Sequence, residues 1–294
     1  MDTKVSRTPA VGSPAASAPI VVGVDARGRS TSAVVWAAEE AERSRRALRL
    51  VTVHEGDAGR DPGATHGLAA LARRLTLADV SYHAAAGSPA DVLLDEAERA
   101  SLLVVGRRGV SAAQRLLLGS TSLAVSGRSP VPVVVVPEPW IQPSLSSAPV
   151  VVGVTPPDLV GDDGAPEAVR EDAVLAWACE RASRLRVPLI VVSAWEIPSV
   201  YTWSPVDVAA WRARYAEALE LLVAPWRQRY ADLEVVARSV VEAPTQALVD
   251  ASGVCQLVVV GQHPRSHLGR LVVGSTSGAV LDRATRPVAV VPVG

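Results

Sequence analysis

Short, wholly apolar runs alternate along the chain with longer segments in which apolar residues recur every three or four positions. Apolar runs of about four to eight residues, bounded by turn residues, are typical of strands buried on both faces of a parallel sheet. The longer segments have the period of helices that pack on such a sheet. The first strand is expected at Pro19–Asp25, and a helix from about Thr31 to Arg46 follows it.

The first half of the chain continues this alternation. Further strands are expected at Leu48–His54, Asp79–Ala86, Leu102–Gly106 and Pro130–Pro137, and further helices at Leu68–Leu77, Ser88–Ala100 and Ser120–Gly127. The third strand is the least apolar, which indicates a less buried position. Strands alternating with helices predict an α/β fold with an open, doubly wound parallel sheet. In such sheets the ligand lies outside the carboxyl ends of the strands, where the strand order reverses.

The pattern occurs twice. Leu102–Ser122 reads LLVVGRRGVSAAQRLLLGSTS, and Leu257–Ser277 repeats it as LVVVGQHPRSHLGRLVVGSTS, displaced by 155 residues. VVGVD at Val21–Asp25 likewise recurs as VVGVT at Val151–Thr155. A repeat of this length predicts two tandem domains, each with a five-stranded Rossmann-like sheet.

The expected organisation is a flexible tail at 1–18, a first domain at 19–138, a Pro/Ser-rich linker at 139–148 and a second domain at 149–294. The tail lacks the apolar segment of a signal peptide. No apolar run reaches the length of about 18 residues that a membrane span needs. These features predict a cytoplasmic protein without a membrane partner.

Composition narrows the chemistry further. The net charge of −1 gives no electrostatic footprint for nucleic acid. Cys179 and Cys255 lack metal-ligand spacing, so no metal site is expected and a reducing compartment is indicated. Lys4 is the only lysine, and this bias towards arginine is typical of a GC-rich bacterial genome.

Glycines and hydroxyl residues mark a candidate anion site in the first half. Gly106 ends an apolar strand, Gly109 follows it, and Gly119 precedes Ser120 and Thr121 at the expected start of a helix. The first N–H groups of a helix and its dipole favour an anion, and glycines let an oxyanion approach the backbone. The segment 106–121 is therefore interpreted as a cradle for nucleotide phosphates.

Asp25 ends the first strand at the same edge of the predicted sheet. It is expected to face the same ligand as the cradle, and Arg107 is a further candidate because its guanidinium can pair with phosphate. There is no Gly-x4-Gly-Lys-Ser/Thr motif and no evident pairing of a nucleophile with a base. Little or no turnover is expected.

VVGVD, the spacing Gly-x2-Gly-x9-Gly-Ser and the terminal PVPVVVVP together resemble the universal stress protein family, and the whole chain resembles its tandem members. The resemblance implies an ATP-binding stress-response protein that acts as a sensor or regulator. It places Asp25 near the adenosine, Val53 at the adenine pocket and 106–121 around the triphosphate. It leaves open whether a divalent cation such as Mg²⁺ accompanies the nucleotide.

The second half departs from this pattern at two positions. Thr155 stands where Asp25 stands, and Pro264 stands where Gly109 stands. Proline has a fixed φ and no N–H, so it cannot donate to a phosphate. An unmade charge-assisted hydrogen bond costs roughly 1.5–3 kcal/mol, or about one to two decades in affinity. We expect the first half to bind ATP and the second to bind it weakly or not at all.

Other functions stay open on the sequence alone. They are a slow ATPase or adenylate-forming enzyme that uses Asp25, a binder of cyclic AMP, and a scaffold for a regulatory protein partner. Aromatic residues in the second half favour either the scaffold or a longer helix with an enlarged core; they are Trp195, Tyr201, Trp203, Trp211, Tyr215, Trp226 and Tyr230. The apolar last strand of each half is expected to pair with the other in an intramolecular pseudo-dimer, with or without further homodimerisation.

Overall fold

The structure, a computed structural model, describes residues 18–25, 31–54, 62–75, 77, 79–107, 118–140, 147–156, 167–197, 208–262 and 274–293. The first half contains β1 (Ile20–Val24), α1 (Thr31–Ser44), β2 (Leu48–His54), α2 (Pro62–Arg74), β3 (Val80–Ala86), α3 (Pro89–Ala97), β4 (Leu102–Gly106), α4 (Ser120–Arg128) and β5 (Val133–Val136). The second half contains β6 (Val150–Gly153), α5 (Glu167–Leu185), β7 (Leu189–Trp195), α6 (Val208–Arg229), β8 (Val235–Val241), α7 (Pro244–Ala251), β9 (Leu257–Gln262), α8 (Ser275–Arg283) and β10 (Val288–Pro292).

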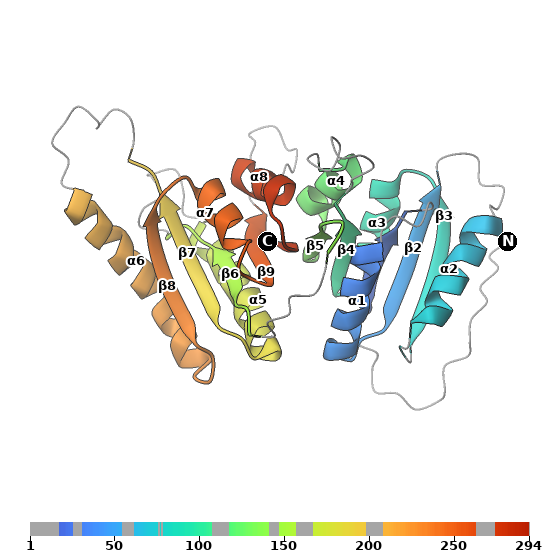
Figure 1. The fold of residues 1–294 in the computed structure, drawn as a ribbon, viewed down its shortest axis with the longest axis horizontal. Coiled ribbons are helices and arrows are strands. Elements are labelled where there is room, and N and C mark those ends of the chain that lie inside the picture. The colour runs from blue at the N-terminus through green and yellow to red at the C-terminus, as the bar shows by residue number, and fades with distance from the viewer. Residues whose placement is uncertain are drawn as a thin grey trace.

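The ten strands form one continuous sheet in the order β3-β2-β1-β4-β5-β10-β9-β6-β7-β8. Within each half the neighbouring strands are parallel, and the chain order reverses between β1 and β4 and again between β6 and β9. The expected fold, a doubly wound parallel sheet in each of two tandem halves, is confirmed. Figure 1 shows the halves as two lobes, blue to green and yellow to red.

The halves join through their last strands. β5 and β10 pair antiparallel, with Val134 opposite Ala289. These two residues occupy the same position in the repeat, so a pseudo-two-fold axis passes between them. The intramolecular pairing expected from the apolar last strands is confirmed, and it covers an edge of each half-sheet that would otherwise invite pairing with another chain.

Helices cover both faces of the sheet. Side chains of α1, α2, α5 and α6 pack on one face, and those of α3, α4, α7 and α8 pack on the other. The glycine of each VVGV segment permits a close approach by the helix above it. A Cβ on Gly23 would lie 3.0 Å from Leu93 Cδ1, and one on Gly153 would lie 2.7 Å from Leu248 Cδ1.

A buried ion pair joins the halves on the α1/α5 face. Glu40 of α1 and Arg181 of α5 pair directly, with side chains only 4% and 5% exposed. Arg181 also lies over the ring of Trp36, 5.1 Å from its centroid. Burial lowers the pKa of the Arg181 guanidinium, and the Glu40 carboxylate opposes that fall. Glu40 and Arg181 occupy equivalent positions of α1 and α5, so the interface matches opposite charges across the pseudo-two-fold axis.

Two details refine the expectations for the first half. The helix expected at Leu68–Leu77 begins earlier, at Pro62, and ends at Arg74. Proline is favoured in the first turn of a helix, because the N–H that it lacks would have no partner there. The third strand is indeed less buried than the others, because β3 is an edge strand of the sheet.

Candidate functional site

In the first half, β1 and β4 separate towards their carboxyl ends. Pairing between these strands ends at Val22 and Val104, although the strands continue to Val24 and Gly106. β1 and β2, by contrast, stay paired up to Val24, whose carbonyl also accepts a hydrogen bond from Thr52 Oγ1 (2.9 Å). Asp25, which is half-buried, follows β1 at this opening. The arrangement agrees with the ligand position of open α/β sheets.

The start of α4 is tied to the end of β4. Ser122 Oγ donates to the carbonyl oxygen of Gly106 at 2.8 Å, so the first turn of the helix is fixed against the strand end. Gly119 is the N-cap residue and provides no side-chain cap. Ser120 and Thr121 are the first two residues of the helix. The first N–H groups of a helix have no partner within it, so this end can receive an anion.

The start of α1 already holds a carboxylate from the same chain. Glu138 accepts hydrogen bonds from the backbone N–H (3.1 Å) and the hydroxyl (2.7 Å) of Ser32. Ser32 Oγ in turn accepts the N–H of Trp140 at 2.9 Å. A carboxylate at a helix N-terminus is favourable. The anion-binding capacity of α1 is therefore used internally, which distinguishes α1 from α4.

The other predicted residues have separate positions. Val53 is half-buried near the end of β2 and packs on the α3/α4 side of the sheet. Gly109 lies outside the described residues. Asp25, Val53, Gly106 and the start of α4 thus belong to the carboxyl edge of the first half-sheet.

Arg107 contacts the second half. Its Nη1 donates to the carbonyl oxygens of Ala284 (2.6 Å), Asp282 (3.0 Å) and Leu281 (3.4 Å), at the end of α8. Burial lowers the pKa of Arg107, and the Asp282 carboxylate opposes that fall. The sequence indicated a phosphate partner here. It missed the interface role, which depends on the pairing of β5 with β10.

The second half has the same hydrogen bond between helix start and strand end, but not the other features of the candidate site. Ser277 Oγ donates to the carbonyl oxygen of Gly261 at 3.0 Å, and Gly274 is the N-cap residue of α8. Thr155, in the place of Asp25, is exposed. Pro264 lies outside the described residues. The strand-to-helix contact is thus common to both halves, whereas the acidic residue is not.

Aromatic residues of the second half pack together. Trp195 stacks on Tyr215 with ring centroids 4.4 Å apart and also lies near Trp211. Trp195 and Trp226 are buried, at 5% and 8% exposure. These contacts support the enlarged core rather than an exposed aromatic surface. Tyr201 and Trp203 lie outside the described residues.

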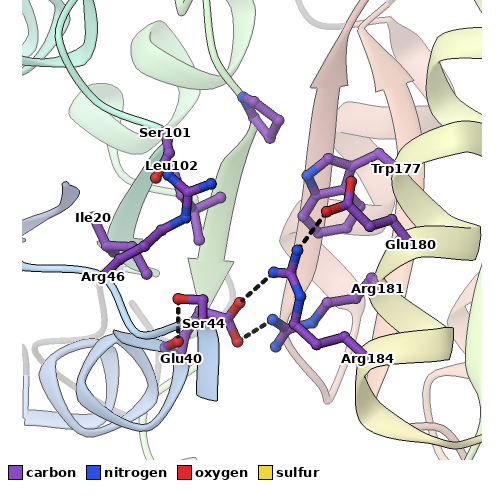
Figure 2. Close-up of a pocket in the computed structure, with 11 residues that line it drawn as sticks. Ile20, Glu40, Ser44, Arg46, Ser101, Leu102, Trp177, Glu180, Arg181 and Arg184 are labelled. Carbon is purple, nitrogen blue, oxygen red and sulfur yellow. Dashed lines mark hydrogen bonds and ion pairs between the residues drawn. The ribbon is translucent and has the colours of Figure 1, made fainter. Parts of the chain in front are cut away.

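A crevice of about 190 Å³ lies between the halves, at the amino ends of β1 and β4. Figure 2 shows Glu40, Arg181 and Arg184 around it, with Arg184 Nη1 3.7 Å from Glu40. Because the candidate site lies at the carboxyl ends of the same strands, the crevice is separate from it.

No metal-binding cluster is found among the residues that the structure describes. Cys179 and Cys255 are free and buried. Burial raises the pKa of Cys179 to about 11 and that of Cys255 to about 12, so both thiols stay protonated near neutral pH. Within the described ranges, no helix is both long and apolar enough to cross a membrane.

Comparison with known proteins agrees with the architecture. The model of the universal stress protein family matches residues 17–137 and 159–292. A universal stress protein of Mycobacterium tuberculosis is 30% identical over 293 residues, covering 92% of this chain and 96% of that protein. One from Mycolicibacterium smegmatis is 32% identical over 300 residues, with the same coverage.

Solved structures agree in fold over nearly the full length. A putative universal stress protein of Pseudomonas aeruginosa superposes with a TM-score of 0.67 at 18% identity, covering 94% of this chain and 93% of that one. One from Archaeoglobus fulgidus gives 0.65 at 18% identity, covering 93% and 96%. Family model, relatives and fold agree for both halves, and the chain belongs to the universal stress protein family.

Proposed function

We propose that the first half binds ATP at the carboxyl edge of its sheet and that the protein acts as a nucleotide-dependent regulator. The supporting observation is that Asp25 follows β1 at the opening between β1 and β4, beside the start of α4 that the Ser122–Gly106 hydrogen bond fixes. In this proposal the backbone of Gly106, Gly119, Ser120 and Thr121 receives the phosphates. Gly109 would complete that cradle.

The use of the two helix starts supports the assignment. Glu138 occupies the start of α1, so a second anion there would meet a carboxylate. Gly119 leaves the start of α4 without a side-chain cap. The phosphates are therefore assigned to α4. The adenosine is assigned to the side of Asp25 and Val53, whose strands β1 and β2 are paired.

Titration calorimetry on the full chain tests this function. We expect one ATP site per chain, measured with and without Mg²⁺, and weaker binding of AMP and cyclic AMP because they offer fewer phosphate groups. Absence of ATP binding would reject the proposal, and two equivalent sites would reject the assignment to the first half. Phosphate release, measured in parallel, would distinguish a regulator from a slow ATPase.

A substitution at Asp25 tests the adenosine side. We expect Asp25→Ala to weaken ATP binding about tenfold, through loss of one hydrogen bond to a charged group. The control is Asp91→Ala: Asp91 is an exposed carboxylate on α3 that pairs with Arg128 and should not affect binding. Equal effects of both substitutions would contradict the role of Asp25.

A further inference from the structure

The two described residues that flank segment 108–117 of the first-half cradle both bind α8 of the second half. At one end, Arg107 Nη1 donates to the carbonyl oxygen of Asp282, in the last turn of α8, at 3.0 Å and to that of the C-cap residue Ala284 at 2.6 Å. The last carbonyls of a helix have no partner within it and form the negative end of its dipole. The half-buried Arg107 guanidinium is a suitable cap for them.

At the other end, the backbone N–H of Leu118 donates to Asp282 Oδ1 at 2.8 Å. Leu118 directly precedes Gly119, the N-cap residue of α4. An aspartate in the last turn of a helix is unfavourable with respect to the helix dipole. Asp282 is compensated by contacts outside its own helix: the N–H of Leu118 and the nearby charge of Arg107.

The arrangement has no counterpart in the other direction. The repeat places Gln262 where Arg107 stands and Gly127 where Asp282 stands. Gly127 has no side chain, so α4 cannot offer the second-half loop the carboxylate that α8 offers the first. The equivalents of Asp25 and Gly109 are also missing from the second half, which has Thr155 and Pro264 at those positions. All three differences leave the first half as the one with the candidate site.

We propose that α8 of the second half is a positioning element of the first-half nucleotide site. Asp282 and the α8 carbonyls hold Leu118 and Arg107, and thereby keep the first N–H groups of α4 and the end of β4 in place for a polyphosphate. Arg107 is accordingly a positioning residue rather than a phosphate ligand. This inference rests on the proposed ATP site, and it gives the second half a role in binding without a nucleotide of its own.

The positioning role predicts a selective loss of phosphate recognition. In the full chain, Asp282→Ala is expected to lower the affinity for ATP about tenfold, within the usual range of coupling between sites. The affinity for adenosine, measured by competition, should stay within about twofold, because the α8 contacts act on the phosphate side only. Asp282→Asn keeps an oxygen acceptor for Leu118 N–H and should retain ATP affinity to within about threefold.

Arg283→Ala is the matched control. Arg283 is the next residue of α8, and its exposed guanidinium donates to Gln246 at 2.7 Å. We expect it to leave both affinities unchanged. Unchanged ATP affinity in Asp282→Ala, or equal losses for ATP and adenosine, would overturn the inference while the proposed function stands. If the unsubstituted protein binds no ATP, the proposed function fails first and the inference fails with it.

Discussion

The two halves use the same contact between a strand end and the helix that follows. Ser122 donates to Gly106 in the first half, and Ser277 donates to Gly261 in the second, at 2.8 and 3.0 Å. Only the first half retains an acidic residue after its first strand. A contact kept in both halves serves the fold, because it persists where the expected ligand groups are lost. The third hydroxyl of the Gly-Ser-Thr-Ser segment is therefore not, by itself, a sign of a ligand.

The differences between the halves gather around one site. Thr155, Pro264 and Gly127 stand where Asp25, Gly109 and Asp282 would be needed for a second site of the same kind. Comparing the copies thus separates the residues that build the sheet from those that we assign to nucleotide.

The largest expected effect concerns the opposite charges at the equivalent positions 40 and 181. Arg181→Leu leaves the Glu40 carboxylate buried, with Arg43 and Arg184 at 3.6 and 3.7 Å as its remaining, partly exposed partners. We expect a loss of about 3 kcal/mol in the free energy of unfolding. Replacing both residues by leucine should restore most of it. Urea denaturation measures both, with Arg128→Leu, at the exposed pair with Asp91, as a surface control expected to cost under about 1 kcal/mol. Equal losses for the single and double variants would contradict the expectation that an uncompensated buried carboxylate causes the loss.

Exchanging the loop residues tests the nucleotide assignment. Gly109→Pro should weaken ATP binding by about one to two decades, because the loop loses one N–H donor. Pro264→Gly combined with Thr155→Asp should create weak binding in the second half, still below that of the first because Gly127 offers no carboxylate. Calorimetric stoichiometry measures both changes. A Gly109→Pro protein with full affinity would show that the proline at position 264 is not a reason for the halves to differ in binding.

Substituting the glycines of the VVGV segments should have a smaller effect on stability. The effect is expected to be larger for Gly153 than for Gly23. Gly153→Ala should destabilise the fold by roughly 1–3 kcal/mol, because its Cβ would lie 2.7 Å from Leu248 Cδ1. Gly23→Ala should cost less, since the corresponding distance to Leu93 is 3.0 Å. Thermal unfolding of both variants checks the order, and the reverse order would contradict it.

The smallest expected effect is a loss of stability at alkaline pH. It arises in the second half, which contains both cysteines. The pKa of Cys255 rises from 9.0 to about 12 on burial, so the folded thiol keeps its proton after the unfolded one has lost it. The free energy of unfolding should fall by about 1 kcal/mol between pH 8 and 9.5 through this group. Cys255→Ala should reduce that slope, as measured by denaturation at several pH values. An unchanged slope would contradict the assignment.

Apolar periodicity was sufficient for the sheet, because buried parallel strands such as β4 and β5 are nearly continuous apolar runs. The same pattern could not show that Arg107 binds α8, since that contact requires the antiparallel pairing of β5 and β10. One signal was present: the repeat aligns Glu40 with Arg181, and opposite charges at equivalent positions suit a pseudo-symmetric interface. The start of α2 at Pro62 was missed because its first turn is rich in glycine and polar residues. The domain bounds and the nucleotide contacts stay predictions.

The antiparallel pairing of β5 with β10 also limits whether either half of this protein can be produced by itself. Val133–Val136 is completely buried, and β10 is what lies along its free side. Either half produced alone would have its apolar last strand as an exposed edge strand. That strand would pair with a second copy or cause aggregation. Because β5 and β10 belong to one chain, their pairing does not depend on protein concentration, as pairing between two separate copies would.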